Sequence, residues 1–165
     1  MSESCPDCVL IISGNDPSGG AGMAADLQAV STLGAHPAPV ITSLTVQDTR
    51  NAYRVFVPEP ELVAEQAETV LEDMDIRAVK IGLLADAAVG NAVAEVLEKR
   101  SRIPVVLDPV LVAAGGAALA EKALESVLLN RLLPLTTVLT PNALELSRLG
   151  GGGDNRAEMA GRLLD

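Results

Sequence analysis

The chain has 165 residues, of which 48% are hydrophobic and 1% aromatic, and its formal net charge at pH 7 is −10. This length is typical of a single domain, whose core must be built from Ala, Val, Leu and Ile because aromatic residues are almost absent. The acidic balance argues against nucleic acid or an anionic membrane as the main partner, and the apolar runs are too short to span a bilayer.

Residues 1–8, MSESCPDC, are predicted to form a flexible N-terminal tail. The tail lacks the basic start and long apolar stretch of a signal peptide, so a cytoplasmic location is expected. Cys5 and Cys8 have the C-x-x-C spacing of half a zinc site or of a redox pair. The sequence has no second cysteine pair, and its one histidine is His36, which leaves too few ligands for a four-coordinate zinc.

From residue 8 onward, apolar segments alternate with segments of helical periodicity. The apolar segments predict strands at 8–13, 39–46, 78–84, 104–108 and 136–140, and residues 53–57 predict a short edge ribbon. The periodic segments predict helices over 20–33, 61–74, 86–100 and 121–133, a short helix from Asn142, and a last helical stretch after the GGGGD segment (150–154). Apolar strands separated by helices indicate an α/β fold, with a parallel sheet covered by helices on both faces.

The segment SGNDPSGGAGMAADL (13–27) joins the first predicted strand to the first helix. Gly14 and Gly19 have the spacing of a phosphate-binding P-loop, but the Lys and the Ser or Thr that should follow are missing. Residues 20–25 match the permissive dinucleotide fingerprint, but that motif begins where the strand ends, and here the strand ends near Ser13. A third interpretation is a loop that binds a small polar ligand.

Asp26 is an unexpected residue on the first helix. At about 100° per residue it falls within the apolar arc formed by Met23, Leu27, Val30 and Leu33. A buried carboxylate without a partner is strongly destabilising, so something must satisfy it. Two partners are open at this point: a donor from the facing strand, or a ligand with amino or hydroxyl donors.

A glycine or a short polar residue follows each predicted strand. Any one of these residues could form a turn or a helix cap. Ligands of open parallel sheets, however, bind beyond the carboxyl ends of the strands, so the set predicts a shared cleft. The set comprises Gly14, Gln47 with Asp48, Gly82, Asp108 and Asn142. Lys80 lies in a strand that should be buried, where it would pair with a carboxylate such as Asp108 or extend to the sheet edge.

Several of these segments together resemble one enzyme family. SGNDPSGGAGMAADL, ITSLTVQDT, AVKIGLL, VVLDPVLVAAGG and VLTPNALE occur in an order and spacing similar to those of the hydroxymethylpyrimidine/phosphomethylpyrimidine kinases of thiamine biosynthesis. The resemblance implies that residues 9–165 are the N-terminal portion of a single ribokinase-like kinase domain. It also implies ATP-dependent phosphorylation of 4-amino-5-hydroxymethyl-2-methylpyrimidine and of its monophosphate, with ATP and Mg²⁺ as cofactors.

The resemblance further implies two groups of site residues. In the first group, Asp26 and Gln47 would hydrogen-bond the aminopyrimidine ring, and Gly14, Leu83 and Val110 would line its pocket. The second group would lie near the magnesium and the phosphates of ATP, where acidic side chains suit a hard cation held largely by the nucleotide. This group comprises Asp108, Asn142 and Glu145.

The sequence departs from the family pattern in several places. Leu83 replaces the usual Met, Asp48 replaces Asn, and Ala114 replaces a frequent Lys. Family members are also considerably longer, and their further segment carries a Gly-rich anion hole with the Cys or Asp that activates the hydroxyl. No catalytic residue is therefore expected in this chain, which alone should be inactive. The GGGGD segment (150–154) lies too early for the anion hole and predicts a flexible surface loop.

Two other functions remain open, a pyridoxal kinase-like enzyme with the same fold and a non-catalytic pyrimidine-binding module. In each case the expected partner is a small heteroaromatic molecule. If the sheet normally continues, the chain leaves an apolar edge unpaired, which predicts aggregation or pairing with another chain, as in a homodimer.

Overall fold

The computed structural model describes residues 6–111, 118–153 and 155–164, with only the backbone described for 118–121. The strands are β1 (Cys8–Asn15), β2 (His36–Gln47), β3 (Ala52–Phe56), β4 (Ile76–Ile81), β5 (Val105–Leu107) and β6 (Val138–Leu139). The helices are α1 (Gly22–Thr32), α2 (Pro60–Asp73), α3 (Ala87–Glu98), α4 (Ala118–Val127), α5 (Ala143–Leu149) and α6 (Arg156–Leu164). In this part of the chain no helix has the length and apolar character needed to cross a membrane.

The strands form one six-stranded sheet in the order β3-β2-β1-β4-β5-β6. Neighbouring strands pair in parallel except β3, which lies antiparallel to β2. The predicted edge ribbon is therefore confirmed, but the sheet is mixed rather than wholly parallel. The cause is the tight turn after β2, in which Asp48 accepts hydrogen bonds from the backbone N–H groups of Arg50 and Asn51, because so short a connection permits only antiparallel pairing.

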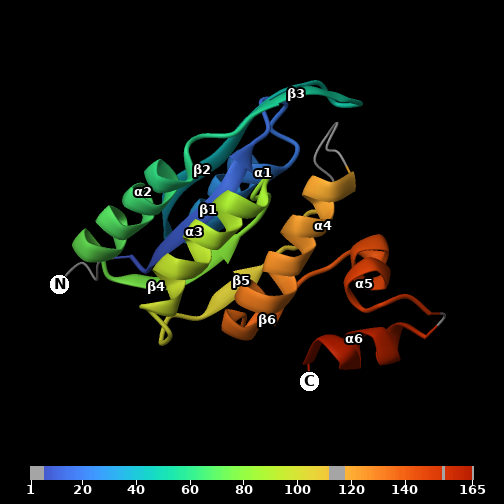
Figure 1. The fold of residues 1–165 in the computed structure, drawn as a ribbon. Coiled ribbons are helices and arrows are strands. Elements are labelled where there is room, and N and C mark those ends of the chain that lie inside the picture. The colour runs from blue at the N-terminus through green and yellow to red at the C-terminus, as the bar shows by residue number, and fades with distance from the viewer. Residues whose placement is uncertain (1–5, 112–117, 154, 165) are drawn as a thin grey trace.

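Helices cover both faces of the sheet, as the sequence predicts. In Figure 1, α2, α3 and α4 lie side by side across one face. Leu10 and Ile12 of β1 and Val79 and Ile81 of β4 are fully buried in the apolar core on that face. Side chains alternate along a strand, so Lys80 of β4 points to the opposite face, where it contacts α1.

The first helix is shorter than predicted and begins at Gly22 rather than at residue 20. It ends at Thr32, and Leu33 is the cap residue, with a side chain that is 86% exposed. The predicted apolar arc therefore loses its last member, because Leu33 lies outside the final helical turn. Met23 is buried, while Leu27 and Val30 are half-buried.

Other boundaries also differ from the predictions. β1 ends at Asn15 rather than near Ser13, and β2 begins at His36 rather than at residue 39. The strand predicted at 78–84 begins at Ile76 and ends at Ile81, since Gly82 and the two leucines after it leave the sheet. The helix predicted at 121–133 begins at Ala118 and changes at Leu128 into a π-helical turn, η1 (Leu128–Leu132), followed by a 3₁₀ turn, η2 (Leu133–Leu135).

The two ends of the chain also refine the predictions. Cys8, assigned both to the tail and to the first strand, is buried as the first residue of β1, whereas Cys5 lies outside the described residues. At the other end α5 and α6 pack against each other, and Figure 1 shows them on the β6 side of the sheet. Arg162 of α6 donates hydrogen bonds to the carbonyl oxygens of Gly150 and Gly152 at 2.6 and 2.7 Å, so the predicted glycine surface loop is tied to the last helix.

Candidate functional site

A pocket of about 190 Å³ lies at the carboxyl ends of β1, β2, β4 and β5. This is the edge of the sheet at which the polar residues following the strands predict a cleft. Its polar lining comes from different strands and from the loop after β1, and its apolar lining includes Leu83 and Val110. The polar side chains are those of Ser13, Asn15, Asp16, Thr45, Gln47, Lys80 and Asp108.

The structure brings together most of the residues that the sequence singles out. Of the predicted pyrimidine group, Gly14, Gln47, Leu83 and Val110 line the pocket, and Asp108 of the predicted ATP group lines it too. Gly82, a member of the strand-end set, also lies at its surface. Four predicted residues are not among the described lining residues: Asp26, Asp48, Asn142 and Glu145. Asp48 instead stabilises the turn between β2 and β3.

Two glycines allow close packing around the loop that joins β1 to α1. A β-carbon on Gly14 would lie 2.5 Å from the Ser43 hydroxyl and 3.1 Å from the Leu83 side chain. Gly22 has a φ of +56°, and a β-carbon there would collide with the Gly14 carbonyl oxygen. A side chain at Gly22 would force the loop away from β1, and one at Gly14 would press against Ser43 and Leu83, so both glycines shape the pocket wall.

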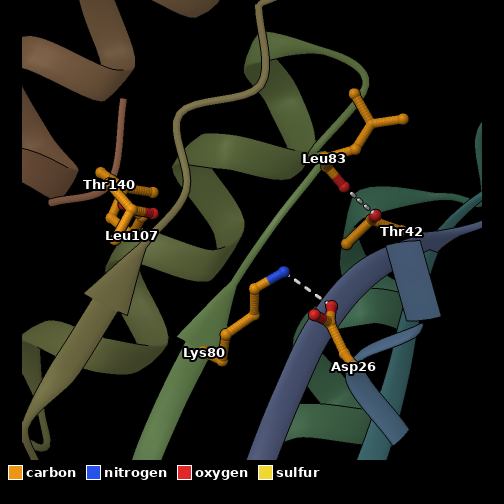
Figure 2. A network of polar contacts seen from close by, with 6 residues as sticks. All are labelled: Asp26, Thr42, Lys80, Leu83, Leu107 and Thr140. Atoms are coloured by element: carbon orange, nitrogen blue, oxygen red, sulfur yellow. Dashed lines mark hydrogen bonds and ion pairs between the residues drawn. The ribbon is translucent and has the colours of Figure 1, made fainter. Parts of the chain in front are cut away.

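A bulge between β1 and β2 fixes the opposite wall. The register shifts between Ser13 and Gly14, so that Thr42 of β2 has no partner residue on β1. The Thr42 hydroxyl donates a hydrogen bond to the Leu83 carbonyl oxygen, as Figure 2 shows. This contact ties the segment after β4 to β2 and holds Leu83 at the pocket. On the far side Thr140 similarly donates to the Leu107 carbonyl oxygen.

Asp16 is a pocket residue that the sequence reasoning missed. Its carboxylate is buried and accepts hydrogen bonds from the backbone N–H groups of Ser18 at 2.8 Å and Ala21 at 3.1 Å. The hydrogen bond from the Ser18 side chain is the largest cause lowering the pKa of Asp16. Burial opposes it, and the two backbone donors and Gln47 add to the lowering. Asp-Pro-Ser-Gly is itself a turn signal that could have identified this residue.

The carboxylate of Asp26 finds its partner within the chain. Its Oδ2 atom lies 2.6 Å from Nζ of Lys80, and Figure 2 shows the two side chains pointing toward each other between α1 and β4. The two side chains are 18% and 22% exposed. Of the two partners left open for Asp26, the donor from the facing strand is confirmed. Lys80 pairs with a carboxylate, as expected, but with Asp26 rather than Asp108.

Asp108 directly follows β5 and is half-buried. Burial raises the pKa of its carboxyl group, the positive charge of Lys80 lowers it, and the negative charge of Asp26 raises it further. The net shift is upward. Asp108 and Asp26 therefore both lie within electrostatic reach of the Lys80 ammonium group.

Asn142 and Glu145 cap α5. Asn142 Oδ1 accepts hydrogen bonds from the backbone N–H groups of Leu144 and Glu145, and the buried Glu145 carboxylate accepts one from the Asn142 N–H at 2.8 Å. This reciprocal arrangement is a capping box. The helix-cap alternative considered for Asn142 is confirmed. Among the described residues, no group of three or more His, Cys, Asp or Glu could hold a metal ion.

The mixed α/β sheet with its pocket at the strand ends is the arrangement of the ribokinase-like kinases, to whose solved structures the chain is similar. The profile of the family described as phosphomethylpyrimidine kinase matches residues 16–163, so the chain belongs to this family. It is 44% identical over 140 residues to the hydroxymethylpyrimidine/phosphomethylpyrimidine kinase of Escherichia coli K12, covering 85% of this chain and 53% of that protein. It is 42% identical to the enzyme of the same name from Rhizobium meliloti, covering 92% of this chain and 57% of that protein.

Solved structures agree with this assignment. The phosphomethylpyrimidine kinase of Clostridium difficile 630 has a TM-score of 0.85 and 32% identity, with 96% of this chain and 70% of that chain covered. The pyridoxal kinase of Staphylococcus aureus in complex with AMP-PCP and pyridoxal has a TM-score of 0.84 and 28% identity, with 98% and 60% covered. The chain thus spans about half the length of the two curated kinases named above.

Proposed function

We propose that this chain provides the substrate pocket of an ATP-dependent kinase of thiamine biosynthesis. The substrates would be 4-amino-5-hydroxymethyl-2-methylpyrimidine and then its monophosphate. The observation that carries the proposal is that the family match includes most of a preformed pocket, in which Gln47, Leu83, Asp108 and Val110 converge from separate segments. A cleft with apolar walls and a few convergent polar groups suits a small heteroaromatic alcohol.

The proposed pyrimidine contacts follow from the chemistry of the lining. The Gln47 amide offers both a donor and an acceptor, which complement a ring nitrogen and an amino group. Leu83 and Val110 would pack against the ring, and Gly14 would let it approach the backbone. Asp26 would accept a hydrogen bond from the amino group while it keeps its ion pair with Lys80.

The proposed reaction is in-line transfer of the ATP γ-phosphoryl group to the hydroxymethyl oxygen, for which positioning and charge neutralisation supply most of the catalysis. Asp108 would lie near the phosphates, where Mg²⁺ held largely by the nucleotide would neutralise their charge. We propose the same neighbourhood for Asn142 and Glu145, in addition to their capping role. We also propose that the 165-residue chain binds the pyrimidine without turning over ATP.

Pyridoxal is the competing substrate, since the pyridoxal kinase structure bound to AMP-PCP and pyridoxal is nearly as similar in fold. Titration calorimetry of the chain with the aminopyrimidine alcohol and with pyridoxal separates the two. Tighter binding of the aminopyrimidine supports the proposal, and a preference for pyridoxal overturns it. An ATP-turnover assay on the same chain tests the last proposal, which measurable pyrimidine-dependent turnover contradicts.

We further propose a homodimer and a cytoplasmic location, where ATP is available. The outer side of the β2–β3 ribbon supports the first of these. Leu44 pairs across the ribbon with Phe56, and their side chains are 45% and 62% exposed, with Val46 beside them at 49%. An exposed apolar patch of this kind is typical of an association surface. Sedimentation of the chain as a monomer at micromolar concentration contradicts the dimer.

A further inference from the structure

The Ser13 hydroxyl is buried at the pocket without a hydrogen-bond partner. Ser13 is fully buried, its Oγ atom finds no partner among the described residues, and the residue lines the pocket. Most buried hydroxyl groups in folded proteins are hydrogen-bonded, because leaving one unpaired is costly. An orphan hydroxyl at a pocket therefore indicates a group that is satisfied when a ligand is present.

Strand alternation determines the direction of this hydroxyl. Ile12 of β1 faces the core beneath α2, α3 and α4, so its neighbour Ser13 faces the α1 side. Lys80 is on the same side, since it pairs in register with Ile11, two residues before Ser13. Ser13 and Lys80 thus lie on neighbouring strands on one face of the sheet, immediately below the pocket.

Gly82 keeps both polar groups uncovered. A β-carbon on Gly82 would lie 2.5 Å from Ser13 Oγ and 2.8 Å from Lys80 Nζ, and Gly82 itself lines the pocket. Because glycine has no β-carbon, the space between the hydroxyl and the ammonium group stays open. Lys80 carries three N–H donors, and its described hydrogen bond goes to Asp26.

We propose that Ser13 and Lys80 form a polar floor that donates hydrogen bonds to an acceptor atom on the buried edge of a heteroaromatic ligand, and that Ser13 determines specificity for that atom. The acceptor is a lone pair on a ring nitrogen or on a ring hydroxyl oxygen. This inference rests on the proposed function, because it deepens the description of the same pocket.

Ser43 provides a matched control. Its hydroxyl is also fully buried and without a partner among the described residues, but Ser43 is not among the described residues of the pocket lining. The variants S13A and S43A therefore remove equivalent orphan hydroxyl groups, one from a residue that lines the pocket and one from a residue that lies behind the lining residue Gly14. The probes are the aminopyrimidine alcohol and pyridoxal, titrated separately by calorimetry against the full 165-residue chain, and each variant is also melted without ligand.

The proposal predicts opposite effects of S13A on stability and on affinity. Both variants should raise the Tm of the free protein, by about 2–4 °C, because an unsatisfied hydroxyl is removed. S13A should also weaken binding about tenfold, the value of one hydrogen bond, whereas S43A should bind as the native chain does.

Three results overturn the proposal. The first is that S13A binds the probe as tightly as the native chain does. The second is that S13A melts at a lower temperature than the native chain. The third is that S43A loses as much affinity for the probe as S13A does. If the native chain binds pyridoxal but not the aminopyrimidine, only the proposed substrate is wrong. The role of Ser13 is then tested by comparing the pyridoxal affinities of S13A and the native chain. If the native chain binds neither probe, both the polar floor and the proposed function are wrong.

Discussion

Nζ of Lys80 lies 2.6 Å from Oδ2 of Asp26, so one ion pair joins a central strand of the sheet to the helix that begins at the glycine loop. Both side chains are largely shielded from water. The pair explains why a carboxylate is tolerated on the inner side of α1. It also holds the Lys80 ammonium group at the pocket, where Lys80 is a lining residue.

Removal of Asp26 should destabilise the protein because it leaves the Lys80 charge partly buried and unpaired. We expect D26A to lower the free energy of unfolding by about 1–3 kcal/mol, less than for a completely buried pair. The double variant D26A/K80M should recover part of this loss. Urea denaturation measures the free energy of unfolding of the native chain and of both variants.

The exposed ion pair between Lys99 and Glu68, at 2.7 Å, is the control. Its side chains are 61% and 39% exposed, so E68A should leave the urea midpoint nearly unchanged. Equal losses for D26A and E68A would show that the Asp26 pair has no special structural role.

The burial of Asp108 predicts that the stability of the protein depends on pH. Burial raises the pKa of its carboxyl group above the ordinary 3.8, so folding disfavours the ionised form. Ionised Asp108 therefore costs stability, and this cost develops as the pH rises through and above the ordinary value. We expect D108N to raise the Tm at pH 7, and this gain to disappear at pH values below 3.8.

Thermal melts of D108N and of the native chain, from pH 7 to below pH 3.8, check this expectation. D75N is the control, because the Asp75 side chain is 88% exposed, and it should leave the Tm unchanged at either extreme. A D108N variant that is less stable than the native chain at pH 7 contradicts the proposed cost of ionising Asp108.

A side chain at Gly82 should close the pocket floor. In G82A the new methyl group would meet Ser13 and Lys80 at 2.5 and 2.8 Å, so one or both must move. We expect at least a tenfold loss of aminopyrimidine affinity by calorimetry. G161A in α6 is the matched control, since a β-carbon there meets no atom within 4 Å, and it should bind normally and melt slightly higher.

The α5 capping box makes a separate prediction. N142A should lower the free energy of unfolding by about 1 kcal/mol through the lost cap, whereas N142D keeps an acceptor and should lose much less. Aminopyrimidine affinity should be unchanged in both variants, because Asn142 is not among the described pocket residues. A loss of pyrimidine affinity in N142A with normal stability would mean that the described pocket is incomplete.

The sequence predicted the fold well where a pattern is local. Apolar runs located the buried strands, and a glycine or polar residue after each strand predicted the pocket edge that Gly14, Gln47 and Asp108 form. The antiparallel direction of β3 was missed, because it depends on the Asp48 turn rather than on periodicity. Leu33 was misplaced because the helix ends one residue earlier.

The partners of charged and polar side chains could not be predicted in the same way. Lys80 and Asp26 are 54 residues apart in sequence, and only the packing of α1 on β4 brings them together. The unpaired Ser13 hydroxyl is likewise invisible in the sequence, where Ser13 is simply the end of an apolar run. The Lys80–Asp26 pair and the unpaired Ser13 hydroxyl both depend on strand register and side-chain direction, which are tertiary properties.

The most direct test of the account is to map where the aminopyrimidine alcohol binds, by following backbone amide NMR signals during a titration. The pocket predicts that the largest shifts will occur at Gly14, Gln47, Gly82 and Leu83, with little change along the outer groove between α2 and α3, where Ala64 and Asn91 lie. Largest shifts in that groove, or no shifts at saturating ligand, would contradict a pyrimidine site at the strand ends.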